Sequence, residues 1–190
     1  MVLAGALFCC QLAAQETTLH NSFSVAYTTL KFDYREQYIG AGLEYRFMLK
    51  PWLGAQVEAS KFPQAQAEHD AISGGSILQC NGSVVAGHRW GKVGVYGEGG
   101  YGYLHTNIFK GGNIEGGQLQ EFYSVRNYPD ILLGTLIDVS VDRRWSLTFD
   151  ARDNLTFIST YTSIGLFGPL YNPAIIENAP EGRAGVAFHF

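Results

Sequence analysis

The sequence predicts an all-β fold, an eight-stranded antiparallel up-and-down barrel that crosses a membrane with its strands. Through almost every segment the apolar residues recur with a period near two, as in strands, rather than 3.6, as in helices. Eight such segments follow one another, joined by connections that are mostly short and long in turn. The last segment, residues 183–190, is so apolar that an open edge would invite aggregation, and closure into a barrel removes that edge.

The expected strands are residues 22–32, 38–47, 53–62, 76–90, 93–105, 130–141, 145–158 and 182–190. Most are near the roughly 9–11 residues that a tilted membrane strand needs. Tight turns are expected at 48–52, 91–92 and 142–144, and long loops at 63–75, 107–129 and 167–181, with 33–37 as a shorter member of the second set. Both termini of the barrel then lie at the end with the tight turns.

The composition and the first residues set the class of protein. Charged residues make up 16% of the 190 residues, against about 25% in typical soluble domains, and the net charge of -4 gives no nucleic-acid footprint. Residues 1–15 are expected to be a secretory signal peptide, with a truncated start because its basic leading region is missing, and residues 16–190 the barrel. Cys80 is then alone in the mature chain and makes no internal disulfide.

Alternate residues separate an oily face from a charged one. In 145–156, for example, Trp145, Leu147 and Phe149 share one face, while Asp150 and Arg152 lie on the other. The polar face is rich in Gly and Ser and nearly lacks Lys, which disfavours the alternative of a solvated sheet in a soluble sandwich. We therefore expect a lumen filled by an ion-pair network of Glu44, Arg46, Glu58, Arg89, Glu98, Asp138, Asp150, Arg152 and Arg183.

All three tryptophans, Trp52, Trp90 and Trp145, stand beside the tight turns. Tryptophan favours the membrane–water interface, where the ring is in an apolar layer and the N–H stays wet. We expect these residues to form an aromatic girdle at one end of the barrel, with Phe190 at the same level. Phe62, Tyr101, Tyr103, Phe157 and Tyr161 are expected at the opposite rim.

The closing strand carries a specific pattern: a polar residue, a glycine, and two aromatics at alternate positions with phenylalanine last. The matching residues are Arg183, Gly185, Phe188 and Phe190. This pattern resembles the terminal-strand assembly signal of bacterial outer-membrane β-barrels, and the mature chain as a whole is similar to the small eight-stranded barrels of the OmpA/OmpX type. The resemblance implies the bacterial outer membrane as location, short periplasmic turns and longer extracellular loops. It implies outer-membrane lipids and lipopolysaccharide as partners, and the barrel assembly machinery during insertion.

Candidate chemistry mostly has a structural explanation. The formal GxGxxG at 97–102 lies within a strand, whereas a dinucleotide site needs it at a strand-to-helix turn. The five histidines lack metal-ligand spacing, and His69, Asp70 and Ser73 share a loop without a visible oxyanion hole. The lumen acids could be paired for glycoside chemistry only around a cleft, which a filled lumen lacks. No catalytic, metal or cofactor-binding residue is therefore predicted.

The sequence favours a non-enzymatic barrel with a structural or surface-binding role through its loops, of which 107–129 is the longest and offers Phe109, Phe122, Tyr123 and Tyr128 for contact. The alternatives are an outer-membrane enzyme acting on lipid A or phospholipid acyl chains, a narrow pore, and a soluble lipocalin-like calyx. The enzyme requires a Ser or His at the lipid-facing or rim surface with an acid partner. The calyx would want an early Gly-x-Trp and a helix after the barrel, and neither is present.

Overall fold

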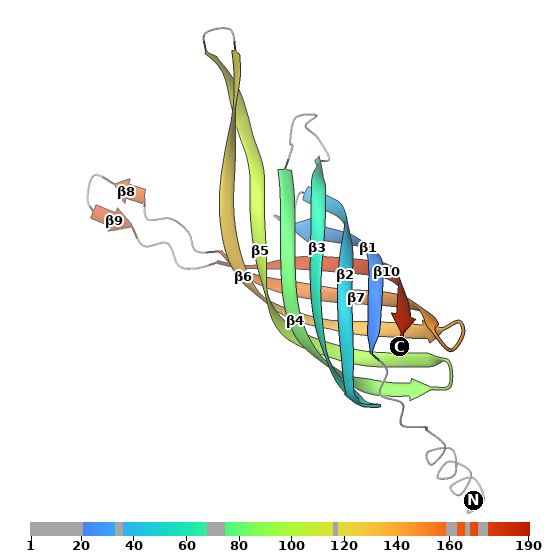
Figure 1. Cartoon of the computed structure of the whole chain (residues 1–190). Coiled ribbons are helices and arrows are strands. Elements are labelled where there is room, and N and C mark those ends of the chain that lie inside the picture. The colour runs from blue at the N-terminus through green and yellow to red at the C-terminus, as the bar shows by residue number, and fades with distance from the viewer. Residues whose placement is uncertain are drawn as a thin grey trace, which may run out of the picture.

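A computed structural model describes residues 21–32, 36–67, 75–115, 118–158, 163–165, 168–170 and 175–190. Eight of its strands close into one antiparallel barrel, which confirms the predicted fold class (Figure 1). The barrel strands are β1 (Ser22–Phe32), β2 (Glu36–Lys50), β3 (Leu53–Ala67), β4 (Gly75–Trp90), β5 (Val93–Glu115), β6 (Gln118–Ser140), β7 (Trp145–Ile158) and β10 (Ile175–His189). The short strands β8 (Ser163–Gly165) and β9 (Gly168–Leu170) form a sheet of their own. In the described part of the chain, no helix is long and apolar enough to cross a membrane.

The barrel closes through pairing of its first and last strands. Each barrel strand pairs with the barrel strand before it and the one after it, so β7 pairs with β6 and β10. The circle closes where β1 pairs with β10, from Ser22↔His189 to Leu30↔Glu181. A closed antiparallel sheet leaves no row of unpaired backbone groups facing hydrocarbon, which is why barrels can span a bilayer. The closed topology therefore satisfies the backbone hydrogen bonds that a membrane-spanning sheet requires, as the alternating sequence predicts.

One end of the barrel, called the turn end below, holds the three tight connections and both described chain ends. The N–H of His189 donates to the carbonyl of Arg144 (2.7 Å), and the N–H of Phe190 donates to the carbonyl of Asn21 (3.0 Å). The carboxyl terminus is thus tied to β1 and to the turn before β7. The opposite end, called the loop end, holds the connections from β1 to β2, β3 to β4, β5 to β6 and β7 to β10.

The structure corrects the expected loop at 107–129. β5 and β6 are each 23 residues long and stay paired as far as Glu115↔Gln118, so almost the whole segment is a hairpin that continues the barrel wall (Figure 1). The glycines and Pro129 suggested a loop, but the ladder accommodates Gly111 with a register shift after Phe109, and Pro129 pairs opposite Tyr103. The residues 109–115 and 118–124 of this hairpin are called the ribbon below.

Two other expected loops are shorter than predicted for the same reason. β3 continues through Pro63 to Ala67, and β10 begins at Ile175, seven residues before the predicted start. Pro180 lies inside β10, opposite Asp153. Proline was interpreted as a loop signal, although it is tolerated in a strand where its missing N–H is not required.

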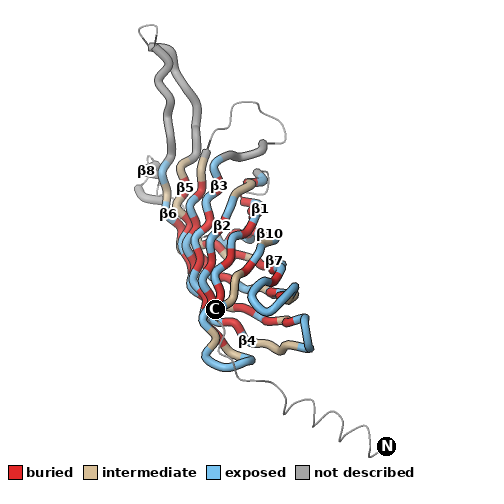
Figure 2. The backbone as a smooth tube through the Cα atoms, turned by 45° about the vertical axis from the view of Figure 1, so that its right-hand side comes forward, coloured by how far each residue is buried: buried red, intermediate tan, exposed pale blue. Residues whose placement is uncertain are grey.

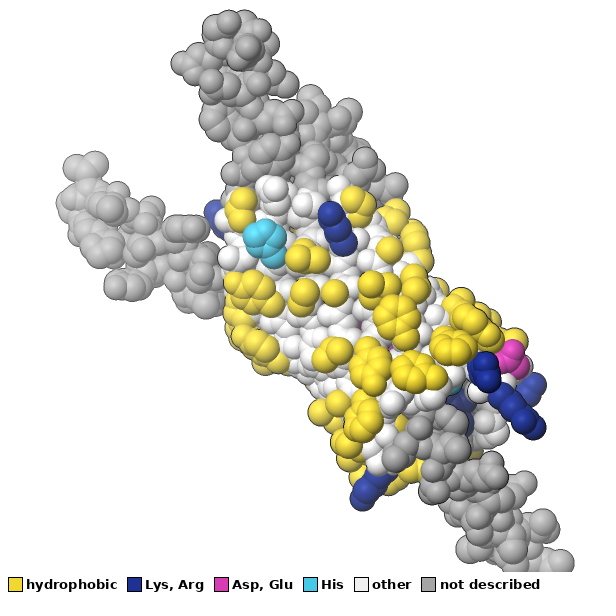
Figure 3. Space-filling model, viewed as in Figure 1, with side chains coloured by type: hydrophobic (Ala, Val, Ile, Leu, Met, Phe, Trp, Pro, Cys, Tyr) yellow, Lys and Arg dark blue, Asp and Glu magenta, His cyan; other side chains and the backbone are white. Residues whose placement is uncertain are grey.

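Burial alternates along the strands in the sense that a membrane barrel requires. In β7, and in β1 from Ser22 to Thr28 apart from Ala26, the polar residues are buried and most of the apolar residues between them are exposed (Figure 2). The exposed wall includes Val25, Leu43, Val57, Leu133 and Phe149. Hydrophobic side chains spread over the visible wall, and the charged side chains visible on that face lie toward its two ends (Figure 3). The oily side therefore faces outward and the polar side faces the lumen.

The lumen is not polar throughout its length. Near the loop end it is closed by a cluster of buried apolar side chains, called the apolar plug: Leu30, Phe32, Tyr38, Phe62, Ile77, Leu104, Tyr128 and Ala179, with Ile158 packed against it. All eight barrel strands contribute a residue, and the rings of Phe32 and Tyr128 lie 5.9 Å apart. A smaller cluster of Val85, Tyr96 and Leu136, with Met48 against it, lies nearer the turn end.

The plug corrects two sequence expectations. Phe62 was predicted at the outer rim and Tyr128 in an accessible loop, but both point into the lumen, and Phe62 is fully buried. Phe62 has the parity of Glu58 and Ser60, so the alternation itself places it inside. Tyr101 and Tyr103 do lie on the exposed wall, whereas Tyr161 lies outside the described residues.

The closing seam gives a first testable prediction. A Cβ added at Gly185 on β10 would stand 2.7 Å from the carbonyl oxygen of Val25 and 2.9 Å from the Cβ of Ala26 on β1. Gly185→Ala should therefore lower the free energy of unfolding by about 1–3 kcal/mol, the usual effect of overpacking. The measurement is urea unfolding of the refolded barrel in detergent micelles, followed by tryptophan fluorescence.

Gly182→Ala is the matched control, because the nearest atom to its added Cβ is the Thr29 hydroxyl at 3.4 Å, an ordinary contact. Equal stability of the two variants would show that the seam is not tightly packed at Gly185.

Candidate functional site

Arg152 on β7 lies at the centre of the lumen and pairs with carboxylates from several strands. Its Nε and Nη2 donate to the two carboxylate oxygens of Glu181 (2.9 and 2.8 Å), and its Nη1 donates to Glu58 (2.7 Å). Nη2 makes a further, short contact with Glu58. The Arg152 side chain is fully buried, and Asp150 lies 3.4 Å from its Nη1. The guanidinium fork thus bridges β3, β7 and β10 across the lumen.

Two more arginines extend the ionic contacts toward the turn end. Arg183 on β10 contacts Glu58 and lies 3.3 Å from Glu44. Arg46 on β2 donates to Glu44 (2.6 Å) and to Asp138 (3.3 Å). Glu44 is shared by Arg46 and Arg183, and Glu58 is shared by Arg152 and Arg183, which joins the individual ion pairs into one network.

Arg89 ends the network at the turn end. Its Nη2 donates to Asp138 Oδ1 at 2.8 Å, and its Nη1 donates to Ser140 Oγ at 2.6 Å. The Arg89 side chain keeps 26% of its surface exposed, whereas the Asp138 side chain keeps 1%. The contacts thus run from the buried centre of the lumen to its mouth at the turn end.

All nine side chains expected in the lumen lie on its inner face, and each has an arginine–carboxylate contact within 4 Å. Sequence reasoning missed Glu181, which shares Arg152 with Glu58. The predicted strand began one residue later, at Gly182, because Pro180 was interpreted as part of a loop. The alternate residues Glu177, Ala179, Glu181 and Arg183 share one face of β10, and this spacing could have placed Glu181 in the lumen.

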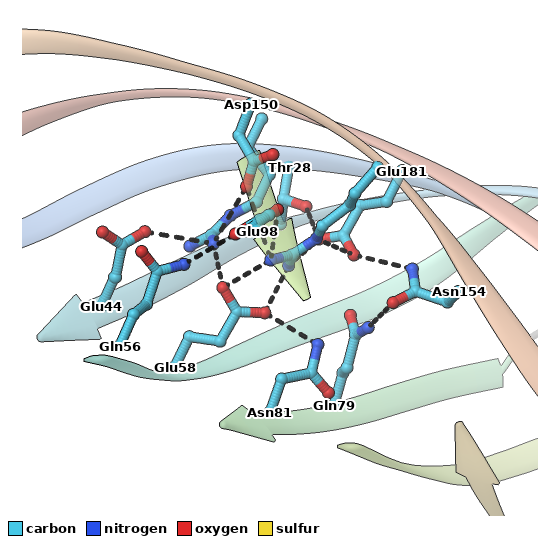
Figure 4. Close-up of polar contacts among 12 residues, drawn as sticks. Thr28, Glu44, Gln56, Glu58, Gln79, Asn81, Glu98, Asp150, Asn154 and Glu181 are labelled. Atoms are coloured by element: carbon cyan, nitrogen blue, oxygen red, sulfur yellow. Dashed lines mark hydrogen bonds and ion pairs between the residues drawn. The ribbon is translucent and has the colours of Figure 1, made fainter. Parts of the chain in front are cut away.

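Neutral amides complete the hydrogen bonding of the network. Gln56 accepts from Arg46 Nε (3.2 Å) and donates to Glu98 (3.2 Å). Asn81 donates to Glu58 (2.9 Å), and Asn154 donates to Glu181 (3.1 Å). These amides add hydrogen bonds between β3 and β5, between β4 and β3, and between β7 and β10, beside the contacts of the arginines (Figure 4).

Acidic groups outnumber arginines inside the described barrel. Three arginines are buried and Arg89 is half-buried, while eight carboxylates are buried: Glu44, Glu58, Glu98, Asp130, Asp138, Asp150, Glu177 and Glu181. Buried charges are expensive unless they are paired, so the surplus acids must either be neutral or have a partner other than arginine.

The residues expected in the aromatic girdle, Trp52, Trp90, Trp145 and Phe190, all lie exposed on the outer wall at the turn end. Trp145 packs edge-to-face on Phe188 with centroids 5.0 Å apart, and the ammonium of Lys50 lies 5.5 Å from the Trp52 ring centroid. Exposed rings beside cationic side chains suit the boundary between hydrocarbon and headgroups.

The four residues of the expected assembly signal divide between the two faces of β10. Arg183 points into the lumen network, and Gly185 lies against β1 at the seam. Phe188 is half-buried and Phe190 is exposed, and their rings stack with centroids 6.3 Å apart. The outward aromatics therefore lie on the last strand of the barrel, beside Trp145 of the girdle.

The turn before β7 is held by a side-chain cap. Asp142 Oδ1 accepts hydrogen bonds from the backbone N–H of Arg144 (2.7 Å) and of Trp145 (2.8 Å). These bonds favour the carboxylate and lower the pKa of Asp142, which is fully exposed. The cap fixes the chain direction at the point where Trp145 enters the wall.

The described histidines give limited support for acyl-transfer chemistry. His105, on the outer wall near the loop end, donates from Nδ1 to the amide oxygen of Asn127 at 2.6 Å, where the enzyme hypothesis requires a carboxylate. Ser146 Oγ and His189 Nε2 lie 2.8 Å apart, but Ser146 is fully buried, so its hydroxyl is closed to an acyl substrate. His69, Asp70 and Ser73 lie outside the described residues.

Comparison with known proteins gives the fold and little more. No protein-family model and no curated protein matches the sequence. A major outer membrane protein from Thermus thermophilus aligns with a TM-score of 0.64 at 15% identity, over 90% of this chain and 99% of that one.

Two surface proteins of other bacteria are also similar in structure. Neisserial surface protein A gives 0.56 at 14% identity, over 93% and 100% of the two chains. Ail, the attachment invasion locus protein of Yersinia pestis, gives 0.54 at 13%, over 90% and 99%. These likenesses extend over nearly the whole of each chain and show a shared barrel fold.

Removing the central guanidinium is the second prediction. Arg152→Met keeps the side-chain length but leaves Glu58 and Glu181 facing each other without the charge that both contact. Breaking a buried pair in this way typically costs about 3–5 kcal/mol, so the variant should unfold at much lower urea concentration or fail to refold. The measurement is again urea unfolding of the barrel in micelles.

Arg144→Met is the control, because Arg144 is exposed in the turn before β7. Its unfolding curve should overlay that of the unmodified protein. If Arg152→Met also overlaid it, the ionic network would have no part in holding the barrel closed.

Proposed function

We propose that this integral β-barrel protein of the bacterial outer membrane is a non-enzymatic, closed anchor that presents the ribbon of β5 and β6 at the cell surface for binding. The barrel wall is exposed and apolar, and the lumen is filled by the ionic network and the apolar plug. The ribbon is the largest described structure beyond the barrel wall (Figure 1). The observation that carries the proposal is the length of β5 and β6.

A strand of 23 residues is about twice as long as a bilayer crossing requires. The pairing of β5 with β4 ends at Gly75↔Ile108, and the pairing of β6 with β7 ends at Asp130↔Thr156. Beyond these points the described ladder joins β5 and β6 to each other alone. Among the described strands, none pairs with the outer edge of either ribbon strand, so an extended segment of another protein could add there as a further strand.

The closed lumen supports the anchor role over the pore. An eight-stranded barrel has an interior that side chains just fill. Here the apolar plug draws on every barrel strand, and the Arg152 fork spans the lumen below it. An ion that crossed would have to displace both.

The outer wall also suits lipopolysaccharide. Lys31 on β1 and Lys61 on β3 are exposed on the outer face near the loop end, where ammonium groups can meet the phosphates of a lipid headgroup. The aromatic girdle would mark the periplasmic interface, and the outward aromatics of β10 would be read by the barrel assembly machinery during insertion. Nothing in the net charge of -4 suits nucleic acid.

The names of two structural neighbours describe attachment and surface roles, which is the class of function proposed here. The ribbon has one basic residue, Lys110, and two acidic residues, Glu115 and Glu121, so it carries only a single excess negative charge. The side chains of Phe109, Phe122 and Tyr123, which were expected to make contacts, are outside the described ones. The proposal therefore rests on backbone pairing in place of strong electrostatic attraction.

Shortening the ribbon tests the surface role. Residues 110–122 would be replaced by an Asn-Gly turn, which joins paired strands in a tight hairpin. The variant should keep the heat-modifiable gel mobility of a folded barrel, and cells carrying it should adhere at least about tenfold less to host-cell monolayers than cells with the full protein, as expected from loss of a main binding element. Unchanged adhesion by correctly inserted protein would contradict the proposal.

Conductance tests the closed lumen. The protein reconstituted in planar bilayers should give no stepwise current, because the plug and the network leave no water-filled path. Steady single-channel steps would favour the narrow pore instead. Replacement of Leu104 by Gly, which removes a fully buried plug side chain, is the matched variant to compare if steps are seen.

A further inference from the structure

We propose that the lumen holds a hard cation, with Ca²⁺ as the fitting occupant, between the apolar plug and the arginine network. The candidate ligands are oxygen atoms of Gln79 and Asn81 on β4, Asp130 on β6 and Thr156 on β7. All four side chains are at least nine-tenths buried, and each has an oxygen without a hydrogen-bond partner among the described residues.

The register places these residues side by side. Asn81 pairs with Gly102, Gly102 with Asp130, and Asp130 with Thr156, so they form one row across β4, β5, β6 and β7. Gln79 is two residues from Asn81 and faces the same side. The next residue of the row, Glu177 on β10, pairs with Thr156 and adds a second buried carboxylate nearby.

Both amides are oriented by the hydrogen bonds that they donate. Asn81 Nδ2 donates to Glu58 (2.9 Å), so its Oδ1 is turned away from the network. Gln79 Nε2 donates to Asn154 Oδ1 (3.1 Å), which leaves its own oxygen without a donor (Figure 4). Two carbonyl-type oxygens are therefore presented to the row in place of N–H groups.

Gly102 provides the space in which these oxygens meet. A Cβ at this position would stand 2.6 Å from Asp130 Oδ1 and closer still to Asn81 Oδ1. The carboxylate and the amide oxygen thus lie together over the bare backbone of β5. Glycine weakens a strand interior, and a close approach of other groups is a common reason for its presence there.

The charges make the arrangement costly without a cation. Asp130 is fully buried, and neither of its oxygens meets hydrogen-bond geometry with a described donor. The Gln79 amide lies against this carboxylate and the field of Arg152 reaches it. However, the Gln79 nitrogen is directed at Asn154, and the Arg152 N–H groups are directed at Glu58 and Glu181. A buried carboxylate facing other acceptors is unfavourable, and a cation at that point would convert every one of these contacts to an attraction.

The donor set selects the kind of cation. Carboxylate, amide and hydroxyl oxygens are hard ligands, which disfavours copper or zinc. Ca²⁺ accepts such mixed oxygen ligands in irregular geometry, whereas Mg²⁺ demands a near-ideal octahedron and keeps several waters, which a site beneath the apolar plug would exclude. Although the histidine spacing predicts no metal site, amide oxygens were outside that reasoning. No described group of three or more His, Cys, Asp or Glu is placed to hold a metal, so amide and hydroxyl ligands are essential to the proposal.

The test uses the full barrel refolded from urea into a neutral detergent with Ca²⁺, so that the ion can enter before the barrel closes. After dialysis, bound calcium is measured by mass spectrometry of the metal, with protein-free micelles as blank. About one equivalent per chain is expected. Asp130→Asn, which keeps the shape and removes the charge, should weaken retention by at least about tenfold, as even loss of a group that only supports a metal ligand costs 10–100-fold.

Asp142→Asn is the control for loss of a carboxylate, since Asp142 lies exposed in a turn, and it should retain the ion. Gly102→Ala against Gly97→Ala gives a second pair, because the nearest atom to a Cβ at Gly97 is 3.8 Å away. Should Asp130→Asn not refold, this pair and the stoichiometry of the unmodified protein decide. Absence of bound calcium in the unmodified protein, or equal retention by Asp130→Asn, would overturn the site.

Discussion

The bond between Arg152 and its two glutamates is the constraint around which the interior is arranged. The apolar side chains of the wall face lipid, so the hydrophobic effect does not drive them into a core as it does in a soluble protein. The strands are instead joined across the lumen by charge-assisted hydrogen bonds, with Arg152 contacting Glu58 on β3 and Glu181 on β10. Because the guanidinium is fixed by its fork geometry, these contacts also set which residues face each other.

The apolar plug and the ionic network divide the length of the lumen between two kinds of packing. At the level of Leu104 and Tyr128 the lumen is as apolar as a soluble core, while two residues further along each strand, at Gly102 and Asp130, it is polar. The row at Gly102 lies at this boundary, where water is excluded on one side and charges are fixed on the other. Several oxygen atoms without a hydrogen-bond partner among the described residues lie at this boundary. Asp130 is the clearest case of a surplus carboxylate, because both of its oxygens are of this kind.

The sequence predicted those features of the fold and the site that follow from the alternation of polar and apolar residues. It records which side of the sheet a residue faces, so the nine lumen residues and the exposed tryptophans could be assigned from the sequence. The alternation does not show whether an inward position lies in a polar or an apolar part of the lumen. Phe62 was therefore expected at the lipid-facing rim, because it is aromatic. Strand ends were missed at Pro180 and Pro129, where a local loop signal is outweighed by pairing with a distant strand. Because the strand end near Pro180 was missed, Glu181 was left out of the predicted network.

The seam between β1 and β10 has a consequence for how the protein forms. Thr28 donates to Glu181, a residue 153 positions away, and the whole seam joins parts of the chain that are equally remote. Contacts of such high sequence separation slow folding, because the intervening chain must be ordered before they bring any gain. An intermediate with seven strands would expose two rows of bare amides to hydrocarbon, so insertion and closure must be completed as one cooperative event.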